Sequence, residues 1–405
     1  MLMFKFIHTS DWHLGQNFYG YDRSEEQRDF LRQLADIVRE EQPDALLVSG
    51  DIYHTAAPSS TAVSMYVKGM LDIHEACPEM TIVVIAGNHD SASRLQSESL
   101  LWKVAGVTVL GGIARDGDGL ADLESHIIPV KVKDKNKGII AAVPYAHPTS
   151  FPLIESGAME GNQRQRAYFE ALLNRVEQLN SDKLPVALMA HLAVNNSDFT
   201  GHDRNMTMEC VEIDTLGSGY DYAALGHIHR PQDVSEHARY CGTPIPVSFD
   251  EQCRHSVSLV TIDAHGAKPV VKELDITNIR PLHTVPADNP VSFDEALGMV
   301  AERKDINDAY IRLNVAVDRY LPHGAQERAA KAVSEQQGRF CEIKKTALQT
   351  ASAGSRQMTV EEFNSKQPIE VANQFFMDKT GQGMTDEEKA MFKYVQQLVE
   401  EEKRQ

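Results

Sequence analysis

Residues 1–285 of this chain repeat one pattern, in which a short apolar run stops abruptly at polar side chains that can bind metal ions. Runs this short and this rich in β-branched residues are typical of buried strands. Five runs fit the pattern, and the polar residues that follow them are Asp11 and His13 after residues 4–7, Asp51 after 45–48, Asn88, His89 and Asp90 after 82–85, His191 after 186–189, and His227 and His229 after 222–225. We therefore expect five buried strands with candidate ligands at their carboxyl ends.

Amphipathic helices are predicted between these strands. Residues 24–41 place several apolar side chains on one helical face, namely Phe30, Leu31, Leu34, Ile37 and Val38. Pro43 ends this helix, because proline disfavours helical geometry in the residue before it. Residues 59–75 form a second predicted helix. Strands that alternate with helices indicate a layered α/β domain, in which ligands collect beyond the carboxyl ends of the strands.

The pattern changes near residue 285, where prolines recur at positions 281, 286 and 290. We place a domain boundary here, so that a first domain spans residues 1–285 and a small α+β domain spans residues 286–350. The predicted elements of the small domain are helices at residues 293–303 and 324–336 and strands at residues 309–317 and 340–347. Residues 351–358 form a polar linker.

Two helices are predicted in the tail, residues 359–405. Thr359 with Glu362, and Thr385 with Glu388, each fit a capping box, in which the two side chains bond each other's backbone N–H groups. The second helix carries an apolar stripe made of Met391, Val395, Leu398 and Val399. This stripe suits docking of a partner protein, and packing on the chain's own domain is the alternative.

Composition narrows the class of protein further. No apolar run approaches the roughly 20 residues of a membrane helix, and residues 1–10 lack the features of a signal peptide, so we expect a cytoplasmic protein without a membrane partner. The five cysteines are scattered without a CxxC pair, which argues against a zinc ribbon or a disulfide framework. The formal net charge of −18 argues against nucleic acid when taken alone, although it says little about one local groove.

Two dyads, Asp11-x-His13 and His227-x-His229, are central to the predicted chemistry. Side chains two positions apart on an extended backbone point the same way, so each dyad can present two ligands to one cavity. Asp51, Asn88 and His191 bring the number of candidate metal ligands to seven. Each motif alone could be a turn or a pair of buried structural histidines, but their joint occurrence at strand ends favours a metal site.

The residue types suit a pair of divalent cations. Two such ions about 4 Å apart can clamp a phosphodiester and generate hydroxide near neutral pH. Asp11 and Asp51 remove only two of the four positive charges, since the histidines and Asn88 are neutral, and the remainder is available to the phosphate. Asp51 suits the place between the ions. Mixed carboxylate, imidazole and amide ligands favour Mn²⁺ or a similar ion over one that seeks thiolates.

The ordered motifs resemble those of the calcineurin-like metallophosphoesterase superfamily. Further stretches are similar to the bacterial SbcD-type nuclease subunits within it, namely residues 9–15, 50–58, 87–90 and 240–244. The resemblance is strong over residues 1–285 and covers the small domain and tail by layout only. It implies a layered β-sandwich flanked by helices, a small α+β capping domain and a C-terminal helical tail.

The resemblance also implies roles for single residues. One metal ion takes Asp11, His13, Asp51 and His229, and the other takes Asp51, Asn88, His191 and His227. His89 is implied to be the acid or charge stabiliser beside the scissile phosphate, with Asp90 orienting its ring. His54 either assists exonuclease chemistry or has a structural role only.

The activity implied is two-metal hydrolysis of DNA, by 3′–5′ exonuclease action and by endonuclease action on single strands and hairpins. The implied partner is an SMC-like ATPase of the SbcC type, gripped by the tail stripe. The implied assembly is a homodimer within a heterotetramer, working at the nucleoid.

Three other functions remain open from the sequence. A phosphoprotein phosphatase usually has Asp where His54 stands and Glu where Asp90 stands, which counts against it. A small-molecule phosphodiesterase does not need the extra domain and tail. A non-catalytic scaffold protein should have lost ligands, and none of the seven is missing.

Overall fold

The computed structural model describes residues 3–155, 159–201, 210–318, 320–347, 369–370, 372–373, 376–377 and 383–402. The chain divides into two compact units. The first comprises Met1–Val315 and Pro322–Lys344, and the second comprises Ala316–Leu321 and Lys345–Gln405. All seven candidate metal ligands belong to the first unit. Among the described residues, no helix is both long enough and apolar enough to cross a membrane.

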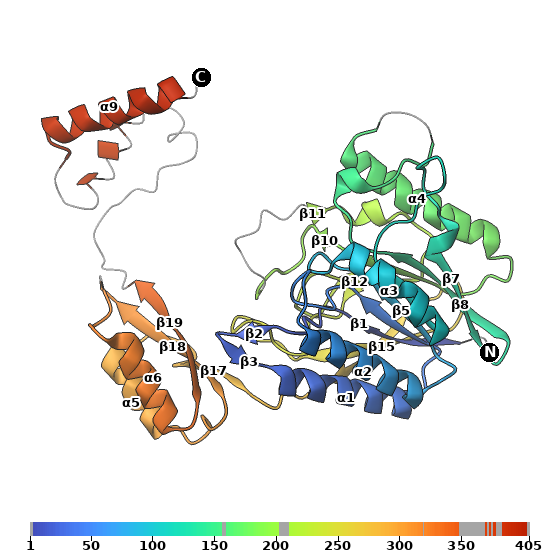
Figure 1. The fold of residues 1–405 in the computed structure, drawn as a ribbon, viewed down its shortest axis with the longest axis horizontal. Coiled ribbons are helices and arrows are strands. Elements are labelled where there is room, and N and C mark those ends of the chain that lie inside the picture. Colours follow the sequence, from blue (N-terminus) through green and yellow to red (C-terminus); the bar gives the residue numbers. More distant parts are fainter. Residues whose placement is uncertain are drawn as a thin grey trace. The chain divides into compact units, whose positions relative to one another are not determined.

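Two six-stranded sheets form the centre of the first unit (Figure 1). The strands of the first sheet are, in spatial order, β16 (Val270–Asp275), β15 (Ser256–Ile262), β1 (Phe4–Thr9), β4 (Ala45–Ser49), β5 (Thr81–Ile85) and β6 (Val107–Leu110). Those of the second are β13 (Gln232–Ser235), β14 (Ala238–Tyr240), β12 (Tyr222–Gly226), β9 (Val186–His191), β8 (Lys135–Val143) and β7 (Ile127–Val132). The pairs from β1 to β6 and from β8 to β14 are parallel, so their carboxyl ends share an edge in each sheet.

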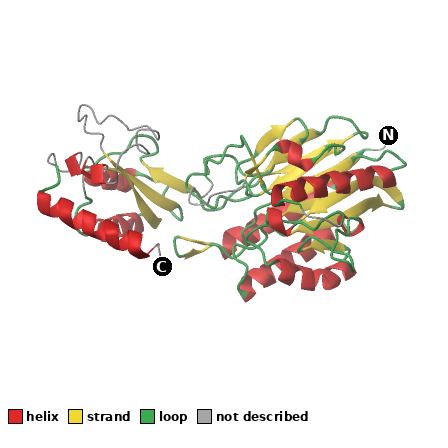
Figure 2. Cartoon of the chain, turned by 90° about the horizontal axis from the view of Figure 1, so that it is seen from above, coloured by secondary structure: helices red, strands yellow, loops and turns green. Residues whose placement is uncertain are grey.

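The two sheets pack face to face around an apolar core. Phe6, Leu47 and Val83 of the first sheet lie in one buried cluster with Met189 and Ala224 of the second. Helices cover the outer faces, as Figure 2 shows: α1 (Ser24–Glu41), α2 (Ser60–Ala76) and α3 (Ala92–Val104) on the first sheet, and α4 (Gly161–Leu179) on the second. The predicted β-sandwich flanked by helices is confirmed. The apolar run of β4 reflects this layering, because all five of its residues are buried.

Several short elements lie outside the two large sheets. They are the strands β2 (Asn17–Phe18), β3 (Tyr21–Asp22), β10 (Ala193–Val194) and β11 (Cys210–Val211), and the 3₁₀ turns Glu124–His126, Pro148–Ser150 and Ile213–Leu216. β2 and β3 form a small hairpin.

A separate three-stranded sheet follows the sandwich in the chain. It contains β17 (Leu282–Val285), β18 (Tyr310–Val317) and β19 (Arg339–Ala347), accompanied by α5 (Phe293–Glu302) and α6 (Ala325–Glu335). Both predicted helices and both predicted strands of this region are present, within a residue or two of their expected ends. β17 was not predicted. It precedes the boundary drawn at residue 285, yet it pairs in parallel with β18.

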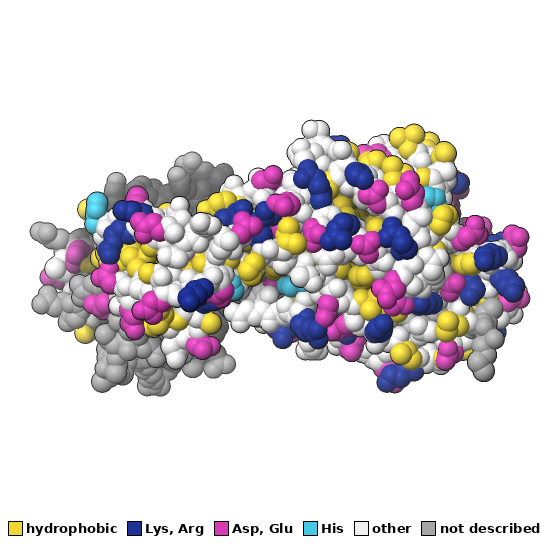
Figure 3. Space-filling view, turned by 90° about the horizontal axis from the view of Figure 1, so that it is seen from below, with side chains coloured by type: hydrophobic (Ala, Val, Ile, Leu, Met, Phe, Trp, Pro, Cys, Tyr) yellow, Lys and Arg dark blue, Asp and Glu magenta, His cyan; other side chains and the backbone are white. Residues whose placement is uncertain are grey.

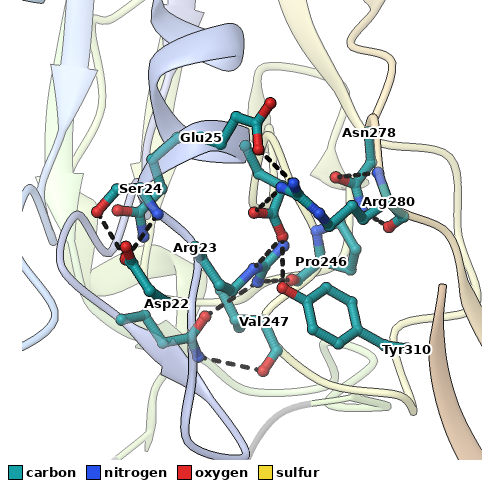
Figure 4. A network of polar contacts seen from close by, with 12 residues as sticks. Asp22, Arg23, Ser24, Glu25, Pro246, Val247, Asn278, Arg280 and Tyr310 are labelled. Atoms are coloured by element: carbon teal, nitrogen blue, oxygen red, sulfur yellow. Dashed lines mark hydrogen bonds and ion pairs between the residues drawn. The ribbon is translucent and has the colours of Figure 1, made fainter. Parts of the chain in front are cut away.

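A buried polar network joins the small sheet to α1 (Figure 4). Glu26 lies at its centre and accepts hydrogen bonds from Tyr310 Oη at 2.8 Å, Arg280 Nη1 at 2.7 Å and Arg23 Nε at 3.1 Å. Arg23, itself fully buried, also donates to the carbonyl of Pro246 at 2.5 Å. Buried charges are tolerated only when they are paired in this way. The network therefore anchors β18 to the sandwich.

The described part of the tail contains α9 (Asp386–Glu402). The predicted capping box at its start is confirmed, because Thr385 N donates to Glu388 Oε2 at 2.8 Å and Glu388 N donates to Thr385 Oγ1 at 3.3 Å. The other predicted box, Thr359 with Glu362, and the predicted linker lie outside the described residues.

Candidate metal centre

The candidate ligands come together beyond the carboxyl ends of β1, β4, β5, β9 and β12. Three groups have their ligand atoms within 4.8 Å of one another: Asp11, His13 and His229; Asp51, His191 and His227; and His13, His54 and His89. The first two groups contain six of the seven candidate ligands. The third group brings the two predicted catalytic histidines to the same place.

Asp51 lies between the first two groups. Its Oδ2 atom is 3.8 Å from His13 Nε2 and 3.5 Å from His191 Nε2, whereas its Oδ1 atom accepts the N–H of His89 at 2.8 Å. One carboxylate oxygen therefore faces both sets of imidazoles. This is the position in which a bridging ligand would lie.

Acceptor atoms converge around His191. Its Nδ1 atom is 2.8 Å from the carbonyl oxygen of Ser49, which can only accept, so the ring hydrogen of the neutral tautomer lies on Nδ1. The Nε2 lone pair then faces Asn88 Oδ1 at 2.9 Å and Asp51 Oδ2 at 3.5 Å. The same Asn88 oxygen is 2.7 Å from His227 Nδ1. The donor set of Asp51, Asn88, His191 and His227 fits a divalent metal ion.

Electrostatics lead to the same conclusion. Burial disfavours the charged form of His191, but the nearby Asp51 carboxylate outweighs burial and raises the pKa of His191 to about 9. Burial likewise raises the pKa of Asp51, yet His191 and His13 shift it downward overall. Without an ion, His191 is thus held protonated against Asp51. A metal ion would take the place of that proton, so metal binding and deprotonation are coupled here.

The backbone around the ligands is unusually constrained. Four of the seven candidate ligands have a positive φ, a conformation that costs free energy for residues other than glycine: Asp11 at 53°, His13 at 45°, Asp51 at 52° and His227 at 102°. Strain of this kind concentrates at functional sites, where the surrounding fold maintains it. Gly87 permits the close approach of strand ends, because a Cβ atom there would lie 2.1 Å from Asp51 Oδ1.

His54 and His89 lie beside the first metal set. Their rings are stacked with centroids 5.8 Å apart, and the His89 ring is 4.9 Å from that of His13. His89 Nδ1 is 2.9 Å from the carbonyl oxygen of His54 and donates to it, which leaves the Nε2 atom as the second nitrogen of the ring. Burial and the neighbouring His89 lower the pKa of His54.

The hydrogen bonds of Asp90 differ from the expectation that it orients the ring of His89. Its carboxylate accepts three backbone N–H groups instead, from Gly87 at 2.8 Å, Tyr53 at 2.9 Å and Ile52 at 3.1 Å. The carbonyl of His54, and not Asp90, accepts from the His89 ring. Burial, followed by the charge of Asp51, raises the pKa of Asp90 to about 7. Asp90 therefore ties the loops after β4 and β5 together.

Sequence reasoning missed three residues that hold the ligands. Ser10 Oγ donates to Asp11 Oδ2, the carbonyl of Ser49 orients His191, and Glu251 Oε1 lies 3.1 Å from His229 Nδ1. Ser10 and Ser49 each lie next to a recognised motif, and that neighbourhood could have marked them as residues that position a ligand. Glu251 belongs to no ligand-like motif, so nothing in the sequence pointed to it.

The predicted partner-binding residues belong to the tail, which is part of the second unit. Met391 and Val395 of α9 are exposed by 71% and 51%. Leu398 and Val399 also belong to α9, but their side chains lie outside the described residues.

The chain is similar in sequence to one group of known proteins. The profile of calcineurin-like phosphoesterases matches residues 4–231, a range that contains all seven candidate ligands. A Rhodobacter capsulatus protein, named as the D component of the nuclease SbcCD, is 32% identical over 305 residues, which span 72% of this chain and 74% of that protein. Proteins of the same name from Escherichia coli and Bacillus subtilis are each 29% identical, over 82% and 81% of this chain and 82% and 83% of their own lengths.

Proposed function

Because this chain belongs to the calcineurin-like metallophosphoesterase family, we propose that it hydrolyses DNA phosphodiester bonds as the nuclease subunit of an SbcCD-type complex. The observation that carries the proposal is the pair of ligand groups joined by Asp51. The expected action is that of a 3′–5′ exonuclease and an endonuclease on single strands and hairpins. With chromosomal DNA as its substrate, the protein would act in the cytoplasm, at the nucleoid.

The proposed metal ligands follow the two groups. One ion would be held by Asp11, His13, Asp51 and His229, and the other by Asp51, Asn88, His191 and His227. Bound ions would supply positive charge to the phosphate and a hydroxide near neutral pH. Mn²⁺ is the proposed metal, because carboxylate, imidazole and amide ligands with no thiolate suit it.

His89 is the proposed acid for the leaving oxygen. Its Nδ1–H is held by the carbonyl of His54, so the ring is fixed and its Nε2 atom is the one that can carry and deliver a proton. His54 would contribute in two ways, through that carbonyl and through the ring stacked on His89. Asp90 would act indirectly, by fixing the loop from which His89 extends.

The proposed partner is an SMC-like ATPase of the SbcC type, and α9 is the proposed docking element. Exposed Met391 and Val395 lie four residues apart, which places them on one face of the helix. An apolar stripe of this kind suits a helical partner such as the base of a coiled coil.

A homodimer within a heterotetramer is also proposed, and exposed side chains of α3 support it. Leu100 and Leu101 are each exposed by 76% and Val104 by 91%. Trp102 anchors this helix to Tyr66 of α2, with ring centroids 5.3 Å apart. A helix that turns three large apolar side chains to solvent suits contact with a second copy.

An acidic chain can still bind DNA through local basic groups. Figure 3 shows Lys and Arg side chains interspersed with Asp and Glu on the face that it draws. Metal ions at the site would add positive charge where the scissile phosphate lies.

The test compares substrates after removal of metal. Purified protein is treated with chelator and then assayed with Mn²⁺, Mg²⁺ or no metal on linear duplex, hairpin and single-stranded DNA, and on a phosphomonoester. We expect DNA cleavage only with metal, fastest with Mn²⁺, and slow monoester hydrolysis. The Asp51→Ala variant, purified identically, controls for contaminating nucleases. Faster hydrolysis of the monoester than of DNA would identify a phosphatase instead.

A further inference from the structure

We propose that Glu251 is a positioning residue of the metal centre, whose carboxylate fixes the ring of His229 so that its Nε2 atom faces the bound ion. The inference deepens the proposed function and rests on it, because the contact serves catalysis only if His229 is a ligand. Glu251 lies on no strand or helix and in no recognised ligand motif. Its part is visible only from the contacts of its side chain.

The first contact determines the tautomer of His229. Glu251 Oε1 lies 3.1 Å from His229 Nδ1, and a carboxylate only accepts hydrogen bonds, so Nδ1 carries the hydrogen. The lone pair of the neutral ring is then on Nε2. That atom lies 3.2 Å from His13 Nε2, inside the group that contains Asp11. A carboxylate that orients a metal-binding imidazole in this way also raises its basicity.

The second set of contacts immobilises Glu251 itself. Its side chain is fully buried, which would be costly for a lone carboxylate. Its Oε2 atom accepts from Thr243 Oγ1 at 2.8 Å and from Val247 N at 3.1 Å. Gly201 makes room for it, because a Cβ atom at that position would lie 2.7 Å from Glu251 Cγ. Both oxygens therefore have fixed partners, and the carboxylate can hold an imidazole in one orientation.

The backbone that carries Glu251 is held from the small sheet. Arg312 of β18 pairs with Asp250 at 2.9 Å, and its guanidinium lies 4.9 Å above the ring of Phe249. Phe249 in turn packs on Phe18 with centroids 5.2 Å apart. The segment before Glu251 is thus clamped between β18 and the sandwich, and this clamp keeps the carboxylate at the distance that His229 requires.

Metal titration tests the proposal on the full-length protein. Chelator-stripped wild type is titrated with Mn²⁺ in a calorimeter and compared with Glu251→Ala, Glu251→Gln and Glu273→Ala. We expect Glu251→Ala to lower the affinity for one of the two ions by 10- to 100-fold, the usual scale when a residue that hydrogen-bonds a metal ligand is lost. The affinity for the other ion should stay nearly unchanged. Glu251→Gln should be intermediate, because an amide oxygen still accepts from Nδ1. Glu273, half-exposed and paired with Arg239, is the matched control and should bind both ions as wild type does.

A spectroscopic measurement tests the same proposal without relying on the folding of a Glu251 variant. Wild type carrying ¹⁵N-labelled histidine and loaded with diamagnetic Zn²⁺ should show His229 with its proton on Nδ1, the resonance being assigned by its loss in His229→Gln. A proton on Nε2 would overturn the proposal. So would wild-type affinity for both ions in Glu251→Ala.

Failure of the proposed function and failure of the Glu251 role give different results. If wild type binds no metal and cleaves no DNA, the proposed function fails. If wild type binds two ions and cleaves DNA while Glu251→Ala binds both ions equally well, only the role of Glu251 fails.

Discussion

His13 Nε2 and His229 Nε2 lie 3.2 Å apart, although 216 residues separate the two histidines in the chain. Two imidazole nitrogens at this distance can share one proton, or both can bind a cation. Asp11 lies in the same group and adds a carboxylate, a ligand type that suits a divalent metal ion. The fold thus brings the first and last of its ligand dyads to one point, and the predictions below follow from that arrangement.

We expect metal binding to stabilise the chelator-stripped protein. A ligand that binds only the folded state stabilises it by about 2.7 kcal/mol when present at a hundred times its Kd. The melting temperature should therefore rise by several degrees on addition of Mn²⁺, measured by scanning calorimetry at constant ionic strength. The Asp51→Ala variant, which lacks the carboxylate between the two groups, should show little or no rise. Equal rises in both proteins would move metal binding away from this site.

Asp51→Ala and His89→Ala should separate metal binding from proton transfer. We expect Asp51→Ala to lose metal content, because Asp51 Oδ2 faces both imidazole sets. His89→Ala should keep both ions and lose turnover by roughly 100-fold or more, the scale of a missing general acid. Elemental analysis and cleavage rates, measured on the same preparations, distinguish loss of metal from loss of proton transfer. Loss of both ions in His89→Ala would show that its assigned role is wrong.

His8 should make the metal-free protein sensitive to acid. Burial, aided by the charge of Arg239, lowers the pKa of His8 from 6.5 to about 3, so the folded state holds the neutral ring. The unfolded chain takes up a proton as the pH falls below 6.5, and stability is lost across that range. Between pH 7.5 and 5.5 the loss from one such group is about 1.4 kcal/mol.

Urea unfolding of wild type and His8→Phe at these two pH values measures the effect. The variant should lose less stability on acidification by about that amount, even if it is less stable at pH 7.5 because Tyr222 loses a partner at 3.0 Å. Replacement of the exposed His323 by Ala is the control and should leave the pH dependence unchanged. Identical pH dependence in wild type and His8→Phe would contradict the assignment.

Removal of the tail should separate cleavage from partner binding. A chain ending at residue 350 keeps every proposed ligand, so it should retain metal-dependent cleavage of short single strands. It should not co-purify with the partner ATPase. Met391→Glu with Val395→Glu should have the same effect within the full chain, whereas Lys393→Ala, two residues from each, should not. Undiminished association of the truncated chain would place the contact elsewhere, and its insolubility would favour packing of the tail on its own core.

The candidate ligands could be picked out from the sequence because their signal is local. A buried strand that ends in polar residues is readable from a few neighbouring positions, and parallel strands necessarily bring those ends to one edge. Helices with one apolar face were equally clear, as in α1, whose bounds match the prediction. α3 was not predicted, because Leu100, Leu101 and Val104 face solvent and blur the periodicity.

Features that depend on contacts between distant residues could not be read from the chain. β17 becomes a strand only by pairing with β18, and the paired residues are 28 positions apart in the sequence. Glu251 is one acidic residue among 58 until the fold brings it to His229. The hydrogen bonds of Asp90 were misjudged for a similar reason, because its partners at Ile52 and Tyr53 come from the loop after another strand.

The most direct test of two-metal DNA hydrolysis is a stepwise Mn²⁺ titration of chelator-stripped protein, with bound metal and DNA cleavage measured on the same samples. The account predicts that each chain binds two ions and that cleavage appears as the second ion binds. Full cleavage with one ion or with none per chain would contradict it.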